Sequence, residues 1–278
     1  MDLAQKKLFL LDLDGTIYLE ETLLPGAAEF LAYVREMGGA YRFLTNNSSR
    51  GVEAGLEKMR RLGIPAERRD FLTAVEATVY YLHKNRSSAD VYYVLGTDSL
   101  RRQLAEAGFT LRDGPADDVT AVLAGFDTEL TYQKIETACR LLARGADFLA
   151  TNPDLACPTL FGFIPDCGSI CRLLVNACGR EPVFIGKPDP TMIRLAWEQT
   201  GYGPAETLMV GDRLYTDIAC GVNAGTDTAL VLTGEATAAD ASAAETPPTA
   251  VYRDMAELLT ALRTARGNFE TVEKEGGL

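Results

Sequence analysis

An apolar run near the N-terminus, KLFLL, leads directly into the tetrapeptide DLDG, and this junction constrains the fold more than any other stretch. A short apolar run of this kind is typical of a strand buried in a parallel sheet. Asp12 and Asp14 then lie at the C-terminal tip of the strand and project to the same side. Gly15 permits the sharp turn that keeps both carboxylates uncovered. Open parallel sheets bind ligands at this edge.

Two neighbouring carboxylates repel each other, so a cation or a proton has to compensate their charge beside apolar residues. Mg²⁺, a hard ion with oxygen ligands, would do so. The pair then suits phosphoryl transfer, in which Asp12 attacks phosphorus and Asp14 supplies and withdraws protons. For DLDG alone, the alternative is a strand-end turn that only caps and is solvated. A calcium loop fits less well, because an EF-hand has its glycine at the sixth position and Gly15 is the fourth.

Composition narrows the class of protein. The 278 residues carry a formal net charge of -12 and are 47% hydrophobic, which suits one large or two ordinary globular domains and argues against nucleic-acid binding. No apolar run is long enough for a membrane span and no secretory signal precedes Lys7, so we expect a cytoplasmic protein without a membrane partner. With one histidine, His83, and no CxxC among the cysteines, zinc is not expected.

The predicted elements alternate along the chain. A helix over 24–37 and a strand over 41–46 follow the first strand, and a right-handed crossover places Thr45 and Asn46 near Asp12. From about Val79 the alternation starts again as a separate unit. We expect further strands at 91–95, 119–124, 148–151, 183–185, 208–210 and 228–232, further helices at 98–107, 132–143, 169–177, 191–199, 218–223 and 255–263, loops at 152–168 and 235–249, and a mobile end at 267–278.

Two later strands also lead into charged residues. Lys187 follows one in IGKPDP, and Asp212 and Asp217 follow another in GDRLYTD. Aspartyl-phosphate chemistry needs a nucleophilic carboxylate, a second acid, a hydroxyl, and a metal and a lysine that neutralise the phosphoryl oxygens. Each motif alone also fits a solvated turn or a helix N-terminus. Their joint occurrence after predicted strands favours the chemistry.

In these motifs the chain resembles the haloacid dehalogenase superfamily, whose four signature elements match DLDGT at 12–16, Thr45 in FLTNN, Lys187 in IGKPDP and GDRLYTD at 211–217. The resemblance implies that Asp12 is the nucleophile and Asp14 the general acid and base. It implies that Mg²⁺ is bound by Asp12, the main-chain carbonyl of Asp14 and Asp212. The residues implied for the phosphoryl group and substrate are Thr45, Asn46, Lys187, Arg213 and Thr216, and those that support the site are Asp217, Gly15 and Asn47.

The place of the additional unit resembles that in the NagD-like group, whose α/β cap is inserted at this point. Predicted elements fill the interval between Asp14 and Thr45, so the extra unit lies between Thr45 and Lys187. The fold implied is an α/β fold with a doubly wound, Rossmann-like parallel-sheet core at 1–78 and 184–278 and a smaller α/β cap domain at 79–183. The loop IPDCGSI departs from the group's pattern, so a substrate preference does not carry over.

Asp14 favours hydrolysis of a phosphate monoester, because dehalogenases and P-type ATPases of this superfamily lack an acid at that position. The expected partner is a small phosphorylated metabolite under the cap, where residues 151–168 either face the substrate or form a structural loop. A homo-oligomer through the cap is also compatible. The alternatives are a phospho-accepting signalling module with little turnover, and a phosphotransferase or mutase.

Overall fold

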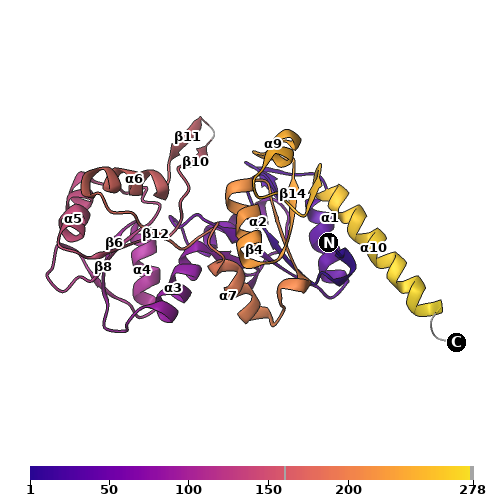
Figure 1. The fold of residues 1–278 in the computed structure, drawn as a ribbon, viewed down its shortest axis with the longest axis horizontal. Helices are drawn as coiled ribbons and strands as arrows, with labels where there is room; N and C mark the ends of the chain where they lie inside the picture. The colour runs from indigo at the N-terminus through magenta and orange to yellow at the C-terminus, as the bar shows by residue number, and fades with distance from the viewer. Residues whose placement is uncertain (160, 276–278) are drawn as a thin grey trace. The chain divides into compact units, whose positions relative to one another are not determined.

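The computed structural model describes residues 1–159 and 161–275, with side chains described as far as residue 267. The chain forms two compact units, shown in Figure 1. The first unit contains residues 1–44, 58–71 and the chain from 193 onward, and the second contains 45–57 and 72–192. The segment expected as an inserted domain, 79–183, therefore lies within the second unit.

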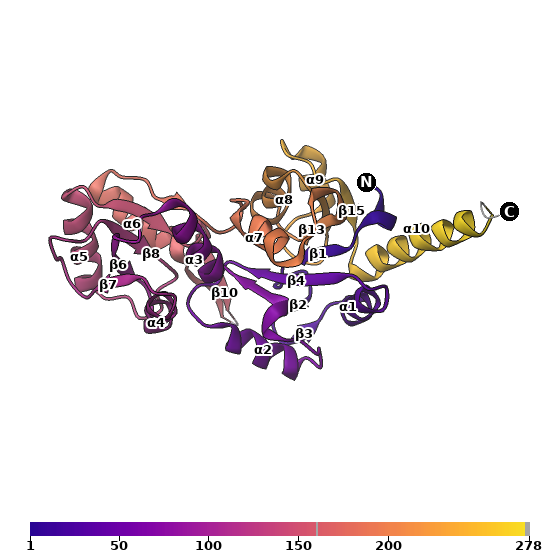
Figure 2. The same cartoon turned by 90° about the horizontal axis from the view of Figure 1, so that it is seen from below.

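The first unit is built on a six-stranded sheet with β1 near its centre. β1 (Leu8–Leu11) pairs in parallel with β13 (Thr207–Gly211) on one side and with β4 (Ala40–Thr45) on the other. All four residues of β1 are buried, because helices lie on both sides of the sheet. Figure 2 shows α1 (Ala27–Glu36) on one side and α8 (Ala219–Ala224) on the other. The sheet is completed by β5 (Phe71–Thr73), β14 (Asp227–Val231) and β15 (Ala250–Tyr252), in the order β15-β14-β13-β1-β4-β5.

One hairpin lies directly after the DLDG turn, between β1 and α1. That hairpin consists of β2 (Tyr18–Leu19) and β3 (Thr22–Leu23). The α-helices among the described residues of this part of the chain are α1 (Ala27–Glu36), α2 (Val52–Arg61), α7 (Thr191–Thr200), α8 (Ala219–Ala224), α9 (Ala238–Ala243) and α10 (Met255–Glu275).

The second unit has its own parallel sheet of five strands and its own core. Neighbouring strand residues divide between its two faces, as side-chain alternation requires: Tyr93 and Val122 join one apolar cluster, and Tyr92 and Leu123 join another. The strands, in the order β12-β9-β8-β6-β7, are β6 (Val91–Leu95), β7 (Thr110–Arg112), β8 (Ala121–Ala124), β9 (Asp147–Ala150) and β12 (Val183–Phe184). Its helices are α3 (Ala74–Asn85), α4 (Asp98–Glu106), α5 (Tyr132–Ala143) and α6 (Cys167–Cys178).

The expected fold class is confirmed, since both sheets are parallel and the smaller one belongs to an inserted domain. Two predicted loops were wrong. Residues 152–168 contain the antiparallel hairpin of β10 (Ala156–Thr159) and β11 (Gly162–Pro165). Pairing between the two strands stabilises this hairpin, and its sequence has no regular hydrophobic period from which the strands could be predicted. Residues 235–249 contain α9, which begins with a capping box between Thr237 and Asp240.

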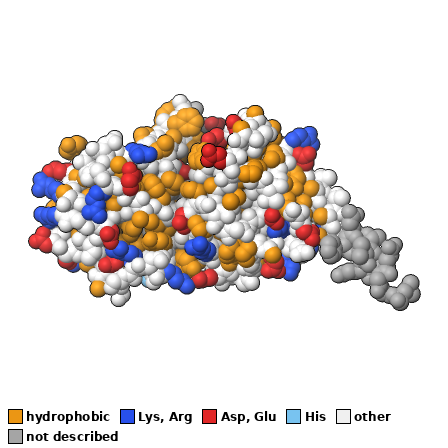
Figure 3. Space-filling model, viewed as in Figure 1, with side chains coloured by type: hydrophobic (Ala, Val, Ile, Leu, Met, Phe, Trp, Pro, Cys, Tyr) orange, Lys and Arg blue, Asp and Glu red, His pale blue; other side chains and the backbone are white. Residues whose placement is uncertain are grey.

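The β10–β11 hairpin exposes large hydrophobic side chains. Leu155, Phe161 and Phe163, in and beside the β10–β11 hairpin, are exposed, and Figure 3 shows hydrophobic side chains gathered there. The last helix continues beyond the expected end at 263 to Glu275, and of the end that was expected to be mobile, residues 276–278 lie outside the described residues. No helix in the described part of the chain is apolar enough over a sufficient length to span a membrane.

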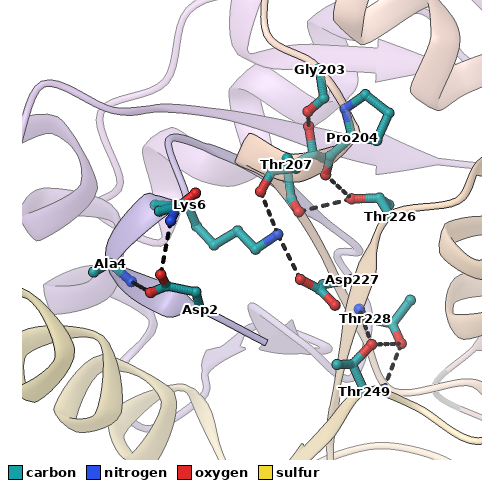
Figure 4. A network of polar contacts seen from close by, with 12 residues as sticks. Asp2, Ala4, Lys6, Gly203, Pro204, Thr207, Thr226, Asp227, Thr228 and Thr249 are labelled. Atoms are coloured by element: carbon teal, nitrogen blue, oxygen red, sulfur yellow. Dashed lines mark hydrogen bonds and ion pairs between the residues drawn. The ribbon is translucent and has the colours of Figure 1, made fainter.

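A buried lysine joins three strands of the first unit at the sheet edge opposite the DLDG turn. The Nζ atom of Lys6 lies 2.7 Å from Asp227 Oδ2 and donates to the Ala205 carbonyl at 2.7 Å (Figure 4). Beside it, the Thr226 hydroxyl donates to the Thr207 carbonyl at 2.8 Å. Because Lys6 precedes β1, while Thr207 begins β13 and Asp227 begins β14, these contacts hold the strand starts together.

We expect Lys6→Met to lower the free energy of unfolding by about 1–3 kcal/mol, because the Ala205 carbonyl and the partly exposed Asp227 carboxylate lose their buried ammonium partner. Lys7→Met is the matched control, since the Lys7 side chain is 53% exposed and its ion pair with Glu206 should contribute less than about 1 kcal/mol. Urea denaturation of both variants measures the difference. Equal stability of the two variants would show that the Lys6 network does not hold the sheet.

Candidate active site

The pairing of β1 with β13 brings two aspartates together. The Asp12 N–H donates to the Val210 carbonyl at 2.9 Å, which continues the ladder one step past β1. Since the two strands are parallel, both end at the same edge of the sheet, and the residues that follow them meet there. One carboxylate oxygen from each of Asp12, Asp212 and Asp217 lies within 4.8 Å of the other two. Asp12 is half-buried and the other two are buried.

Asp217 reaches this cluster through a tight turn after β13. Residues Leu214–Ile218 form a single π-helical turn, and Asp217 Oδ2 accepts a hydrogen bond from the Arg213 N–H at 3.1 Å. A Cβ atom on Gly211 would lie 2.3 Å from the Asp217 Cβ atom, so only glycine permits the side chain to fold back against the strand end. Thr216, in the same turn, is buried.

Asp212 is enclosed by two glycines from different segments. A Cβ atom would lie 2.5 Å from Asp212 Oδ2 if placed on Gly15 and 2.0 Å if placed on Gly234. Gly15 also has a φ of +87°, a conformation that disfavours any other residue. The Glu235 N–H donates to Asp212 Oδ2 at 2.8 Å. Segments that are far apart in the sequence thus shape one small space around this carboxylate.

The cluster fits a hard divalent cation. Its donors are carboxylate oxygens, which Mg²⁺ prefers, and their mutual repulsion at this separation calls for positive charge. Arg213 supplies part of that charge: burial acts to lower the pKa of its guanidinium, but the charges of Tyr215, Asp12, Asp212 and Glu235 outweigh burial and raise it. Asp12, Asp212 and Asp217 are therefore the residues whose side chains could hold a metal ion.

Asp14 differs from the three clustered aspartates. Its side chain is 51% exposed and forms an ion pair with Lys58, with 3.7 Å between Oδ1 and Nζ. The neighbouring Tyr18 is buried, and burial, followed by the charges of Asp14 and Asp12, raises the pKa of its hydroxyl group. Tyr18 therefore stays protonated at neutral pH and can donate a hydrogen bond.

In the second unit, Asn46 is joined to Lys187. The Asn46 Oδ1 atom accepts from the Lys187 N–H at 2.9 Å, and Asn46 Nδ2 donates to the Lys187 carbonyl at 3.0 Å. Both side chains are buried. The adjacent turn is held by the Thr45 hydroxyl, which accepts from the Asn47 N–H at 3.2 Å. The structure thus brings together the predicted residues of the TNNSS and GKPDP motifs within this unit.

A chain of buried, largely uncharged side chains supports that turn, and part of it lies in the segment 151–168, for which the sequence left a substrate-facing and a structural role open. The Ser48 hydroxyl accepts from the Phe126 N–H at 2.9 Å and lies 2.9 Å from the Thr151 hydroxyl, which donates to Asn152 Oδ1 at 2.8 Å. Asn152 in turn donates to Asp166 Oδ1 at 3.1 Å. The available signal was polar residues directly at the end of an apolar strand, in ATNPD. The start of 151–168 therefore has a structural role.

Comparison with known proteins gives one consistent family. A model for haloacid dehalogenase-like hydrolases matches residues 9–110, and a HAD-hydrolase-like model matches residues 184–258. The acid sugar phosphatase of Staphylococcus aureus (strain MRSA252) is 36% identical over 94% of this chain and 99% of its own length. The chain belongs to the haloacid dehalogenase-like hydrolases.

Solved structures place this hydrolase within the NagD and 4-nitrophenylphosphatase subfamily. The 4-nitrophenylphosphatase of Thermotoga maritima has a TM-score of 0.88 and 38% identity, over 94% of this chain and 99% of that one. NagD from E. coli K-12 has a TM-score of 0.83 and 33% identity, over 91% and 98%. The glycerol phosphate phosphatase of Mycobacterium tuberculosis, solved in complex with magnesium, has a TM-score of 0.86 and 30% identity, over 92% and 78%.

The expected membership is thus confirmed, and with it the expectation that this hydrolase is a phosphatase. The individual roles inferred for Asp12, Asp14, Thr45, Lys187 and the other motif residues remain predictions. The structure adds Gly211 and Gly234 to the residues on which the carboxylate cluster depends.

We expect Gly234→Ala to weaken Mg²⁺ binding about tenfold, the lower end of the effects seen when residues around a metal's ligands are changed. The added methyl group would collide with Asp212 Oδ2 and displace it. Gly203→Ala is the control, because its Cβ atom would meet no atom within 4 Å. Isothermal titration calorimetry with MgCl₂ measures the affinities. Wild-type affinity in Gly234→Ala would exclude Asp212 from the metal site.

Proposed function

We propose that the protein hydrolyses a small-molecule phosphate monoester through a phosphoryl group carried on Asp12, with Asp14 as the general acid and base. The observation that supports this most is the clustering of Asp12, Asp212 and Asp217 at the carboxyl edge of β1 and β13. The relatives named as acid sugar phosphatase, 4-nitrophenylphosphatase and glycerol phosphate phosphatase support the same substrate class.

The proposed reaction has two displacements at phosphorus. In the first, an Asp12 carboxylate oxygen bonds to phosphorus, the ester bond breaks, and Asp14 gives its proton to the leaving oxygen. In the second, water attacks phosphorus, Asp14 takes the water's proton, and the bond to Asp12 breaks to release inorganic phosphate. The different surroundings suit these roles, since Asp12 belongs to the clustered carboxylates and the side chain of Asp14 is half-exposed.

Mg²⁺ is the proposed cofactor, and when bound it would draw charge from the phosphoryl oxygens. The carboxylate cluster and the magnesium complex of the glycerol phosphate phosphatase support this choice. Asp12 and Asp212 would hold the ion together with the Asp14 main-chain carbonyl, and Asp217 would support the site from nearby. Arg213 would compensate the remaining negative charge.

Lys187 is the proposed cationic contact of the phosphoryl group, together with Thr45. A lysine that is 3% exposed has little freedom. The Asn46 side chain fixes its main chain on both sides, because it accepts from the Lys187 N–H and donates to the Lys187 carbonyl. Since both functional atoms of the Asn46 amide are engaged with Lys187, we assign Asn46 a role in positioning this lysine. Thr216, Asn47 and Gly15 remain predicted members of the site.

The partner is a small phosphorylated metabolite, and the segment at 79–183 is the proposed substrate-specificity domain. A homo-oligomer through that domain and a cytoplasmic location remain predictions from the sequence.

We expect the wild-type protein with Mg²⁺ to release many equivalents of phosphate from 4-nitrophenyl phosphate, and Asp12→Asn to lower this rate by about three orders of magnitude or more. EDTA should stop the wild-type reaction and added Mg²⁺ should restore it. The measurement is phosphate released per chain over time. A single equivalent that stays on the protein would instead show a phospho-accepting switch, and turnover by Asp12→Asn would remove the nucleophile.

We expect Lys187→Met to raise the activation free energy by about 3 kcal/mol, as the loss of one preorganised charge would. Asn46→Asp keeps the acceptor for the Lys187 N–H but loses the donor to its carbonyl, so it should lower kcat by a smaller factor. In the double variant the two losses should not add, because Asn46 acts through Lys187. Steady-state kinetics of all four proteins test this. Additive losses would show that Asn46 acts independently of the lysine.

A further inference from the structure

Lys58 lies beside Asp14, carries a positive charge and belongs to none of the four motifs. It is in the last turn of α2, and its Nζ atom is 3.7 Å from Asp14 Oδ1. The same Nζ atom lies 3.6 Å from the centre of the Tyr18 ring, a cation–π distance. The Lys58 side chain is 22% exposed, so most of its length is covered.

Tyr18 closes this group of three residues. Its side chain forms a hydrogen bond with Asp14, and its ring carries the Lys58 ammonium group. Tyr18 is 5% exposed and begins the β2–β3 hairpin, directly after the DLDG turn. Because the Tyr18 ring is buried, its position is fixed, and its contact with the Lys58 ammonium group restricts where that group can lie.

A second cation on the same helix shows the contrast. Arg61, three residues further along α2, pairs with Glu21 in the same hairpin, with 3.2 Å between Arg61 Nη2 and Glu21 Oε1. Those two side chains are 48% and 62% exposed, so solvent screens their ion pair. Arg61 therefore connects the helix and the hairpin at the surface, whereas Lys58 reaches the residue proposed for proton transfer.

We propose that Lys58 is a positioning residue for Asp14, which holds one carboxylate oxygen so that the other presents its proton to the leaving group. This inference rests on the proposed function. The ion pair with Lys58 reduces the number of orientations that this carboxylate, which is 51% exposed, can adopt. An ammonium group only donates hydrogen bonds, so with Nζ beside Oδ1 the proton of the acid form belongs on Oδ2.

Substrates with different leaving groups can distinguish a residue that positions Asp14 from the nucleophile, the metal site and Lys187. A 4-nitrophenolate anion is stable in water and can leave without a proton, whereas an alkoxide needs one from Asp14 as the ester bond breaks. Loss of the positioning residue should therefore impair alkyl phosphates much more than 4-nitrophenyl phosphate. A defect in the nucleophile, in the metal site or in Lys187 would impair both substrates.

We expect Lys58→Met to lower kcat/KM for glycerol phosphate about tenfold more than for 4-nitrophenyl phosphate, a modest part of the usual contribution of general acid catalysis. kcat/KM is the right quantity because it reports the steps up to the first irreversible one, before Asp14 acts as a base. Lys58→Arg should recover the wild-type ratio, and Arg61→Met, the matched control on the same helix, should leave it unchanged. Tyr18→Phe keeps the ring and removes the hydroxyl group, so it should shift the ratio in the same direction.

The outcomes distinguish this inference from the function on which it rests. Asp14→Asn is the reference, since it should show the largest leaving-group discrimination. If Asp14→Asn discriminates and Lys58→Met loses both substrates equally or neither, the positioning role is wrong and the phosphatase mechanism stands. If the wild type hydrolyses neither substrate, the proposed function itself fails. If circular dichroism shows that Lys58→Met does not fold, the other two variants decide. A wild-type ratio of the two kcat/KM values in Tyr18→Phe, together with an altered ratio in Lys58→Arg, would then overturn the inference.

Discussion

Repulsion among three carboxylates at the edge of one sheet is the constraint on which the first unit depends. Parallel pairing of β1 with β13 forces Asp12 and Asp212 into proximity, and the turn after β13 adds Asp217. Such a cluster costs free energy unless positive charge compensates it. The cluster lies at the edge where parallel sheets bind ligands. The glycines at 15, 211 and 234 leave space there for the side chains of Asp212 and Asp217.

The buried polar groups of the second unit differ from the carboxylate cluster of the first. Its buried network at Ser48, Thr151 and Asn152 is largely uncharged, so hydrogen bonds alone offset the loss of water. The Asn46 amide extends this network to the main chain of Lys187. Neutral side chains thus supply rigidity around the buried Lys187, which is what a preorganised phosphoryl contact requires. The opposite charges of the proposed mechanism are therefore held by two different kinds of environment.

The sequence was sufficient where one signal controlled the local structure. β6 and α5 have the predicted bounds, because an apolar run and a helical period each stood between clear turn residues. Asp12, Asp212 and Asp217 could be predicted as a group because each follows an apolar strand. The β10–β11 hairpin and α9 could not, since their stability depends on strand pairing and on one capping box rather than on periodicity. Gly234 and Lys58 were missed because their roles arise from contacts with residues distant in the sequence, at Asp212 and Asp14.

Mass spectrometry of acid-quenched protein tests most directly whether the phosphoryl group is transferred to Asp12. The protein would be mixed with substrate and Mg²⁺, quenched within the first turnover, and digested so that the phosphorylated peptide can be sequenced. We expect at most one phosphoryl group per chain, located on Asp12 and lost on incubation at alkaline pH, as an acyl phosphate should be. Steady release of phosphate with the phosphoryl group located on another residue would contradict transfer to Asp12.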